Sequence, residues 1–79
     1  MVTVRYFAGA RAAAGVAEER APAGNLDQLT TVLADRHGPR LAAVFGAASF
    51  LVDGVAWRER DRPLPEAAVV DVLPPFAGG

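Results

Sequence analysis

The sequence contains no cysteine, no lysine and only one histidine, His37. Without cysteine the chain has no disulfide, no thiolate metal site and no cysteine nucleophile, and one histidine cannot complete an ordinary structural zinc site. His37 is also the only candidate base for a serine–histidine triad. All eight basic residues are arginine, which a GC-rich coding bias explains more simply than selection against a reactive amine. These absences argue against most enzyme classes.

The chain also has little net charge and no long hydrophobic run. The net charge of −1 lacks the basic excess that phosphate neutralisation requires, so we expect no nucleic-acid partner. The longest uncharged apolar stretch, residues 41–52, is far shorter than the roughly 20 residues that span a membrane. The N-terminus alternates apolar and polar residues and reaches Arg5 before any apolar block, so no signal peptide is predicted. We therefore expect a cytoplasmic protein with no membrane contact.

What the chain does have is enough apolar material for one small core. Its 79 residues are 52% hydrophobic, which predicts a single domain over 1–79 and leaves no room for a second one. A domain of this size buries only about 60–65% of its unfolded surface, so its stability rests on that core alone. With one histidine and scattered carboxylates, we expect it to fold with no bound metal or cofactor.

Hydrophobic spacing predicts the order of the secondary structure. Asn25 can cap a helix with Gln28 as its capping-box partner, and Asp53-Gly54 is the two-residue signal of a type I′ hairpin. The predicted elements are a strand over 2–7, a short helical turn over 10–14, a strand over 16–21, a helix over 26–37, another short turn over 40–45, a hairpin over 50–57 and a strand over 69–73. This order indicates an α+β roll, a mixed four- to five-stranded sheet with one main helix packed across it.

Few side chains are candidates for chemistry. Trp57 continues the hairpin alternation and is predicted to be a sheet or core residue. His37 lies at a helix C-terminus, where a cation is favourable, and this position explains it better than catalysis does. Glu18 and Glu19 are neighbours on a strand and point to opposite faces, so we interpret them as solvated edge charges.

The least ordinary feature is the tail, residues 74–79. Pro74 and Pro75 favour an extended backbone, and Gly78-Gly79 presents a carboxylate with no nearby Cβ. Such a thin arm can enter a narrow channel and offer its ionised carboxylate as a nucleophile toward the α-phosphate of ATP. Two terminal glycines alone more often mark a frayed end. Phe76 is either folded back on the core or exposed as an anchor for a partner, and the residues leave both open.

Three motifs together resemble the ubiquitin-like sulfur-carrier family, in particular the branch of small subunits of molybdopterin synthase. The run 4–11 followed by Gly15 is similar to that branch's opening strand and short helix, and Val52-Asp53-Gly54 is similar to its Val-Asn-Gly hairpin. The end of the chain, 73–79, resembles its Pro-Pro-Val-(Ser/Ala)-Gly-Gly tail. One departure is Glu66-Ala67-Ala68-Val69, where the family usually has Asp-Gly-Asp-Glu, so both a glycine suited to a positive φ and an acidic pair are missing.

The resemblance implies a β-grasp domain that is a co-substrate and not catalytic alone. An activating enzyme would use ATP to adenylate Gly79, next to Gly78, and a persulfide protein would supply the sulfur of a C-terminal thiocarboxylate. The large subunit of molybdopterin synthase would then receive the tail and pass the sulfur to the pterin precursor of molybdenum cofactor. The residues expected to contact these partners are Phe7, Pro74, Pro75, Phe76 and Ala77.

Two alternatives share the same tail chemistry. The chain could carry sulfur for thiazole or cysteine biosynthesis, because the partner and not the tail chooses the acceptor. It could also be a ubiquitin-like modifier that forms isopeptide bonds with lysines of other proteins. A free monomer that pairs with a large subunit is the expected form, since an exposed apolar tail suits a heteromeric contact.

Overall fold

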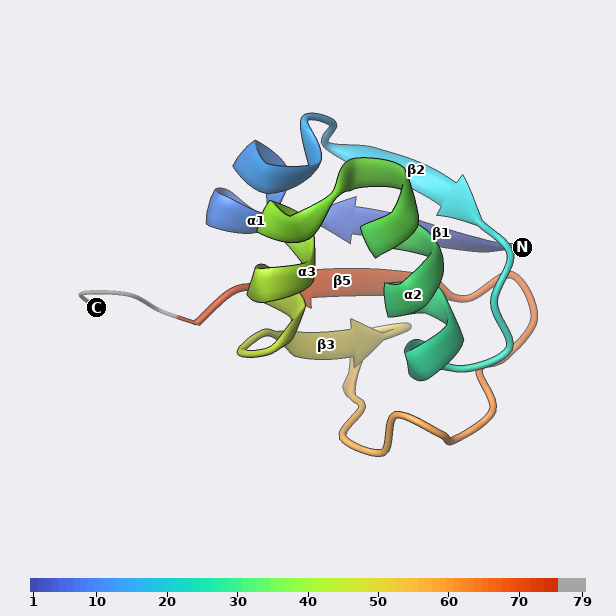
Figure 1. The fold of residues 1–79 in the computed structure, drawn as a ribbon. Helices are drawn as coiled ribbons and strands as arrows, with labels where there is room; N and C mark the ends of the chain where they lie inside the picture. Colours follow the sequence, from blue (N-terminus) through green and yellow to red (C-terminus); the bar gives the residue numbers. More distant parts are fainter. Residues whose placement is uncertain (76–79) are drawn as a thin grey trace.

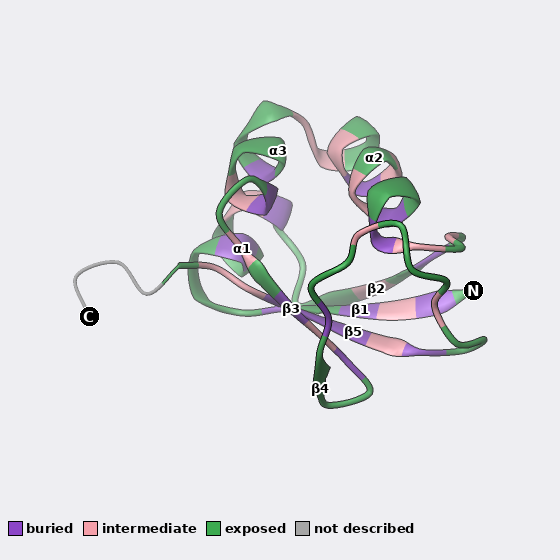
Figure 2. Ribbon diagram, turned by 90° about the horizontal axis from the view of Figure 1, so that it is seen from below, coloured by how far each residue is buried: buried purple, intermediate pink, exposed green. Residues whose placement is uncertain are grey.

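Five strands form one mixed sheet, and three helices lie on one of its faces (Figures 1 and 2). The computed structural model describes residues 1–75. The strands are β1 (Val2–Tyr6), β2 (Glu18–Ala21), β3 (Ser49–Val52), β4 (Val55–Ala56) and β5 (Val69–Leu73), and the helices are α1 (Ala8–Ala14), α2 (Leu26–His37) and α3 (Pro39–Phe45). Within the described residues, the opposite face of the sheet carries no helix (Figure 2). We call it the open face.

The strand order is β2-β1-β5-β3-β4, so the last strand of the chain lies in the middle of the sheet. β5 runs parallel to β1 and antiparallel to β3, and each outer strand is antiparallel to its neighbour. This is the β-grasp arrangement, and it confirms the predicted α+β roll. The parallel pair needs a long crossover, and the helices and the hairpin between β1 and β5 supply it.

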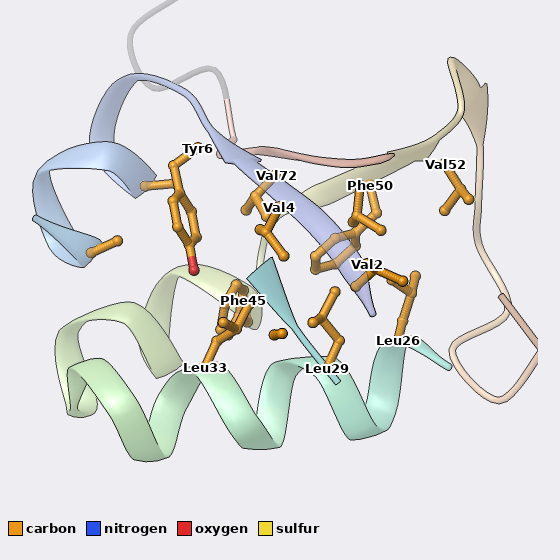
Figure 3. Packing of buried hydrophobic residues seen from close by; sticks show 14 of the residues in the cluster. Val2, Val4, Tyr6, Leu26, Leu29, Leu33, Phe45, Phe50, Val52 and Val72 are labelled. Atoms are coloured by element: carbon orange, nitrogen blue, oxygen red, sulfur yellow. The ribbon is translucent and has the colours of Figure 1, made fainter. Parts of the chain in front are cut away.

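The core lies between the helix layer and the sheet (Figure 3). Alternate residues along the strands face the helices, as the period of two requires. The apolar side chains on one side of α2 face the sheet in turn. The largest fully buried side chains are Val4, Tyr6, Leu26, Leu29, Leu33, Leu41, Val52, Val70 and Val72. Trp57 is buried as predicted, with 9% of its surface exposed.

Local signals in the sequence are realised at two turns. The side chain of Asn25 accepts a hydrogen bond from the Gln28 backbone N–H at 2.8 Å, and the Gln28 side chain accepts one from Gly24 N–H at 2.7 Å. These contacts satisfy backbone donors at the start of α2. In the hairpin, Asp53 has φ +49° and Gly54 has φ +82°, the two positive angles of the predicted type I′ turn.

The structure differs from the sequence prediction mainly in the lengths of the short elements. The two predicted helical turns are complete helices, α1 and α3, each burying two residues on the core. β2 begins at Glu18 and not at Val16, which is exposed. In the part of the chain that the structure describes, no helix is long and apolar enough to cross a membrane.

Candidate functional site

The chain leaves the sheet from the end of its central strand. β5 is paired on both sides, with β1 and with β3, and its three middle residues are buried. Leu73 and Pro74 are half-buried and Pro75 is exposed; we call these three residues the tail root. Proline has no N–H to continue the ladder, so the two prolines end the strand and favour an extended exit.

Phe7 lies beside the tail root. The parallel register pairs Tyr6 with Val72, and the Phe7 N–H donates to the Val72 carbonyl at 3.3 Å. Phe7 and Leu73 are the next residues in this register, so they lie beside each other. Phe7 is 37% exposed, so part of its ring is accessible at this end of the sheet. Of the predicted partner-binding residues, the structure therefore brings Phe7, Pro74 and Pro75 to one end of the sheet.

The remaining predicted site residues are Phe76, Ala77, Gly78 and Gly79, and they lie outside the described residues. The end of β5 from which they continue is the end nearest α1, away from the N-terminus (Figure 1).

The open face carries one fixed ion pair that the sequence analysis missed. Arg5 on β1 and Asp71 on β5 are register partners, and the guanidinium donates to both carboxylate oxygens, Nε to Oδ1 at 2.6 Å and Nη2 to Oδ2 at 3.0 Å. The hydrogen bond to Asp71, reinforced by the charges of Asp71 and Glu18, raises the pKa of Arg5 above its ordinary value. Asp71 is only 7% exposed, although it faces away from the core. The available signal was a lone acid in the otherwise apolar run 69–73.

A second polar cluster ties the edge strand to α2, and it corrects one prediction. Glu18 is exposed as expected, but the Glu19 side chain is only 15% exposed and points to the helix side. Its carboxylate accepts from the Tyr6 hydroxyl at 2.6 Å and from Arg36 at 2.8 Å, and it contacts His37 Nε2. Figure 3 shows the Tyr6 hydroxyl pointing into the helix layer. Glu19 is therefore a partly buried structural anchor, and the prediction of a solvated charge was wrong.

Burial and hydrogen bonding have opposite effects on the pKa of Glu19. Desolvation would raise its pKa, but hydrogen bonds from Tyr6, Arg36 and His37 outweigh it and lower the pKa below its ordinary value. Burial and the hydrogen bond to Glu19 both raise the pKa of Tyr6, so Tyr6 remains a neutral donor. His37 is engaged in this cluster, which agrees with a structural role for it and not a catalytic one.

The turn that precedes β5 carries the departure from the family pattern. Ala67 has φ +58°, in the left-handed region that favours glycine. The end of this turn is fastened to the hairpin, because Asp53 exchanges two hydrogen bonds with the Val69 backbone: the Asp53 N–H donates to the Val69 carbonyl, and the Val69 N–H donates to the Asp53 carboxylate. The turn has a positive φ at Ala67, where the family that the sequence resembles usually has glycine.

Within residues 1–75, no group of three histidine, aspartate or glutamate side chains is placed to hold a metal ion.

Comparison with solved structures links this architecture to ubiquitin-like proteins. No protein-family model and no curated protein sequence matches the chain. The small archaeal modifier protein 1 from Methanosarcina acetivorans superposes with a TM-score of 0.85 at 24% identity, covering 99% of this chain and 95% of that one. This similarity shows the fold.

Two other neighbours are molybdopterin-converting proteins. A Pyrococcus furiosus protein assigned as subunit 1 of molybdopterin converting factor has a TM-score of 0.72 at 29% identity, covering 94% of this chain and 95% of that one. A chain in the complex of subunits 1 and 2 of the same factor from Helicobacter pylori has a TM-score of 0.72 at 23% identity, covering 99% and 97%. Together, these neighbours support the resemblance to the ubiquitin-like sulfur-carrier family.

Proposed function

Because the chain has the β-grasp fold of ubiquitin-like sulfur carriers and modifiers, we propose that it is a sulfur carrier acting through the carboxylate of Gly79. The observation that carries the proposal is the position of β5, whose pairing on both sides holds the tail root at one end of the sheet. Two prolines and two glycines in the last six residues suit a narrow extended arm. The fold supplies a rigid base, and the tail supplies the reacting group.

The chemistry needs no side chain of this protein. A carboxylate oxygen of Gly79 attacks the α-phosphate of ATP in the activating enzyme, pyrophosphate leaves, and a mixed anhydride with AMP forms. A persulfide sulfur attacks the acyl carbon and displaces AMP. Cleavage of the resulting sulfur–sulfur bond by a second thiol leaves the thiocarboxylate and a disulfide on the donor side. A chain without cysteine can carry sulfur in this way at its terminal carboxylate.

The acceptor we propose is the pterin precursor of molybdenum cofactor, with this chain as the small subunit of molybdopterin synthase. The similarity to subunit 1 of molybdopterin converting factor supports this choice, as does the solved complex of subunits 1 and 2 from Helicobacter pylori. The large subunit would dock on the apolar surface formed by Phe7 and the tail root, with Phe76 and Ala77 entering its active site.

Intact-mass analysis tests the carrier chemistry directly. The protein is co-expressed with a candidate activating enzyme and sulfur donor, and the expected product has one oxygen replaced by sulfur. The control is deletion of Gly79, which shortens the arm by about 3.3–3.6 Å, while misplacement of about 1 Å can lower a rate on the order of a hundredfold. The deletion variant should fold but show no thiocarboxylate and no ATP–pyrophosphate exchange. Equal exchange by both proteins would refute Gly79 as the reacting group.

A ubiquitin-like modifier is the second candidate, favoured by the similarity in fold to small archaeal modifier protein 1. The same adenylated Gly79 would then form an isopeptide bond with a lysine of another protein. Tryptic peptides bearing a tail remnant on lysine would support this function. Sulfur transfer to a thiazole or cysteine precursor is distinguished from the pterin branch by assaying the purified thiocarboxylate with each acceptor system.

A further inference from the structure

A cavity of about 310 Å³ lies at the outer edge of the sheet, where β4 stops. β4 is two residues long and β3 is four, so the first half of β3 is paired with β5 on one side but has no strand of residues 1–75 on the side of β4. The last contact is the Trp57 N–H, which donates to the Phe50 carbonyl at 3.0 Å. The chain then leaves β3 in the long connection toward β5 (Figure 1). The cavity is bounded by β3 on one side and by the start of this connection on the other.

The polar side chains around this cavity are mostly hydrogen-bond donors. Ser49 lies on β3, and Arg58 and Arg60 lie on the connection. No aspartate or glutamate of residues 1–75 lines the cavity, and the acid between the two arginines, Glu59, pairs instead with Arg62 at 3.7 Å. The cavity therefore has positive charge and no carboxylate of its own.

The two arginines differ in how firmly they are held. Arg60 donates to the Phe45 carbonyl at 2.8 Å, and its guanidinium lies 5.0 Å from the centre of the Phe50 ring. These contacts fix Arg60 as part of the wall. Arg58 is exposed and makes no ion pair within residues 1–75, so its guanidinium is available to an outside group.

Trp57 also lines the cavity, and it carries a buried donor without a partner among the described residues. Its indole Nε1 is the one buried side-chain nitrogen or oxygen within residues 1–75 that has no hydrogen-bond partner. A buried donor without an acceptor is unfavourable. The Arg62 guanidinium packs 3.9 Å from the centre of the indole ring, and its side chain is 52% exposed.

We propose that this edge is a second interaction site, which binds an extended acidic segment of a partner protein. In an antiparallel strand, alternate residues turn their backbone groups to the same edge, so when the pairing of β3 extends to Ala48, the residue that precedes it, the backbone of Ala48 faces the side on which Phe50 meets Trp57. An incoming strand can pair there, as extended peptides do at open sheet edges. A carboxylate on that segment meets Arg58, and its charge matches the unopposed arginines of the cavity. The site does not depend on the chemistry of Gly79.

The site lies one strand away from the tail root. Ser49 pairs with Leu73 across the β3–β5 ladder, whereas the cavity lies along the edge of β3 that β4 leaves open. A partner bound at the cavity therefore contacts the carrier without displacing β5 from either of its neighbours.

Titration with a peptide, followed by amide proton–nitrogen NMR, tests the proposal on the free protein. The probe is a blocked pentapeptide of alternating valine and glutamate. Trp57 is the only tryptophan, so its indole N–H signal reports unambiguously on this wall. We expect saturable shifts of that signal and of the Ala48 and Phe50 amides. Arg58→Ala should weaken binding about threefold to tenfold, and so should added salt.

Three controls make the outcome decisive. Arg40→Ala removes an exposed arginine on α3, outside the cavity, and should leave the affinity unchanged. A peptide with lysine in place of glutamate should not bind. Free glutarate should bind much more weakly than the peptide; equal affinity would mean a small-carboxylate site and would overturn strand pairing. Absence of saturable shifts with millimolar peptide, or equal affinity of Arg58→Ala and wild type, would overturn the site itself.

Discussion

Replacing Ala67 with glycine should stabilise the protein. Ala67 is exposed and has φ +58°, so the substitution removes no buried contact but relieves a left-handed conformation that costs an L-residue about 1–2 kcal/mol. Glycine loses about 0.5–1 kcal/mol more backbone entropy on folding, which offsets part of the gain. The net increase in the free energy of unfolding should be about 0.5–1 kcal/mol, or roughly 2–8 °C in Tm for a domain of this size.

Thermal and urea unfolding of Ala67→Gly and wild type provide the assay, with Ala42→Gly as the matched control. Ala42 is also an exposed alanine, but it lies inside α3, where glycine should lower stability by about 1 kcal/mol. The two substitutions are chemically identical and should have opposite signs. If Ala67→Gly destabilises as Ala42→Gly does, the turn before β5 is not left-handed in solution and the reasoning fails.

Three further predictions concern named contacts. Because the pKa of Glu19 is lower in the folded protein than its ordinary value of 4.5, its ionisation stabilises the fold above pH 4.5, and this stabilisation is lost as the pH falls below that value. Glu19→Gln should therefore reduce the loss of unfolding free energy at acid pH, as measured by urea unfolding, whereas Glu18→Gln should not. Arg5→Leu should lower Tm by leaving Asp71 buried without its partner, and the double variant Arg5→Leu/Asp71→Val should recover most of the loss; a double variant less stable than the single one would contradict this. Phe7→Ala should weaken binding to the large subunit by about 1–3 kcal/mol in calorimetry with little change in Tm, and a large fall in Tm with unchanged binding would make Phe7 a core residue instead.

Much of the fold was predictable because local signals and the hydrophobic period agree along most of the chain. Asn25 with Gln28, and Asp53 with Gly54, are short-range signals whose geometry depends on adjacent residues, and both are realised. Alternation predicts the first strand, which ends at Tyr6 and not at residue 7, and the short β-branched run 69–73 predicts the last one.

The contacts that were missed depend on the tertiary structure. Glu19 is buried only because α2 returns over β2 and brings Arg36 and His37 to it, and nothing in the local run of charges indicates that return. Asp71 meets Arg5 only because β1 and β5 are parallel neighbours 66 residues apart in sequence. The strand order that creates both contacts could be inferred from the family resemblance but not from the periodicity.

The groups around the tail root indicate which chemical roles this chain leaves to the partners of the proposed carrier function. Phe7 and Leu73 are apolar. On the open face, Arg5 donates two hydrogen bonds to the Asp71 carboxylate, so both of these charged groups already have a partner. No side chain of the described residues near the tail root is poised as a general base, because His37 is held by Glu19 on the helix side of the sheet. If Gly79 is the reacting group, the activating enzyme must supply both the phosphate-binding residues and the proton transfers. The carrier then contributes position, through a central strand whose end is fixed from both sides.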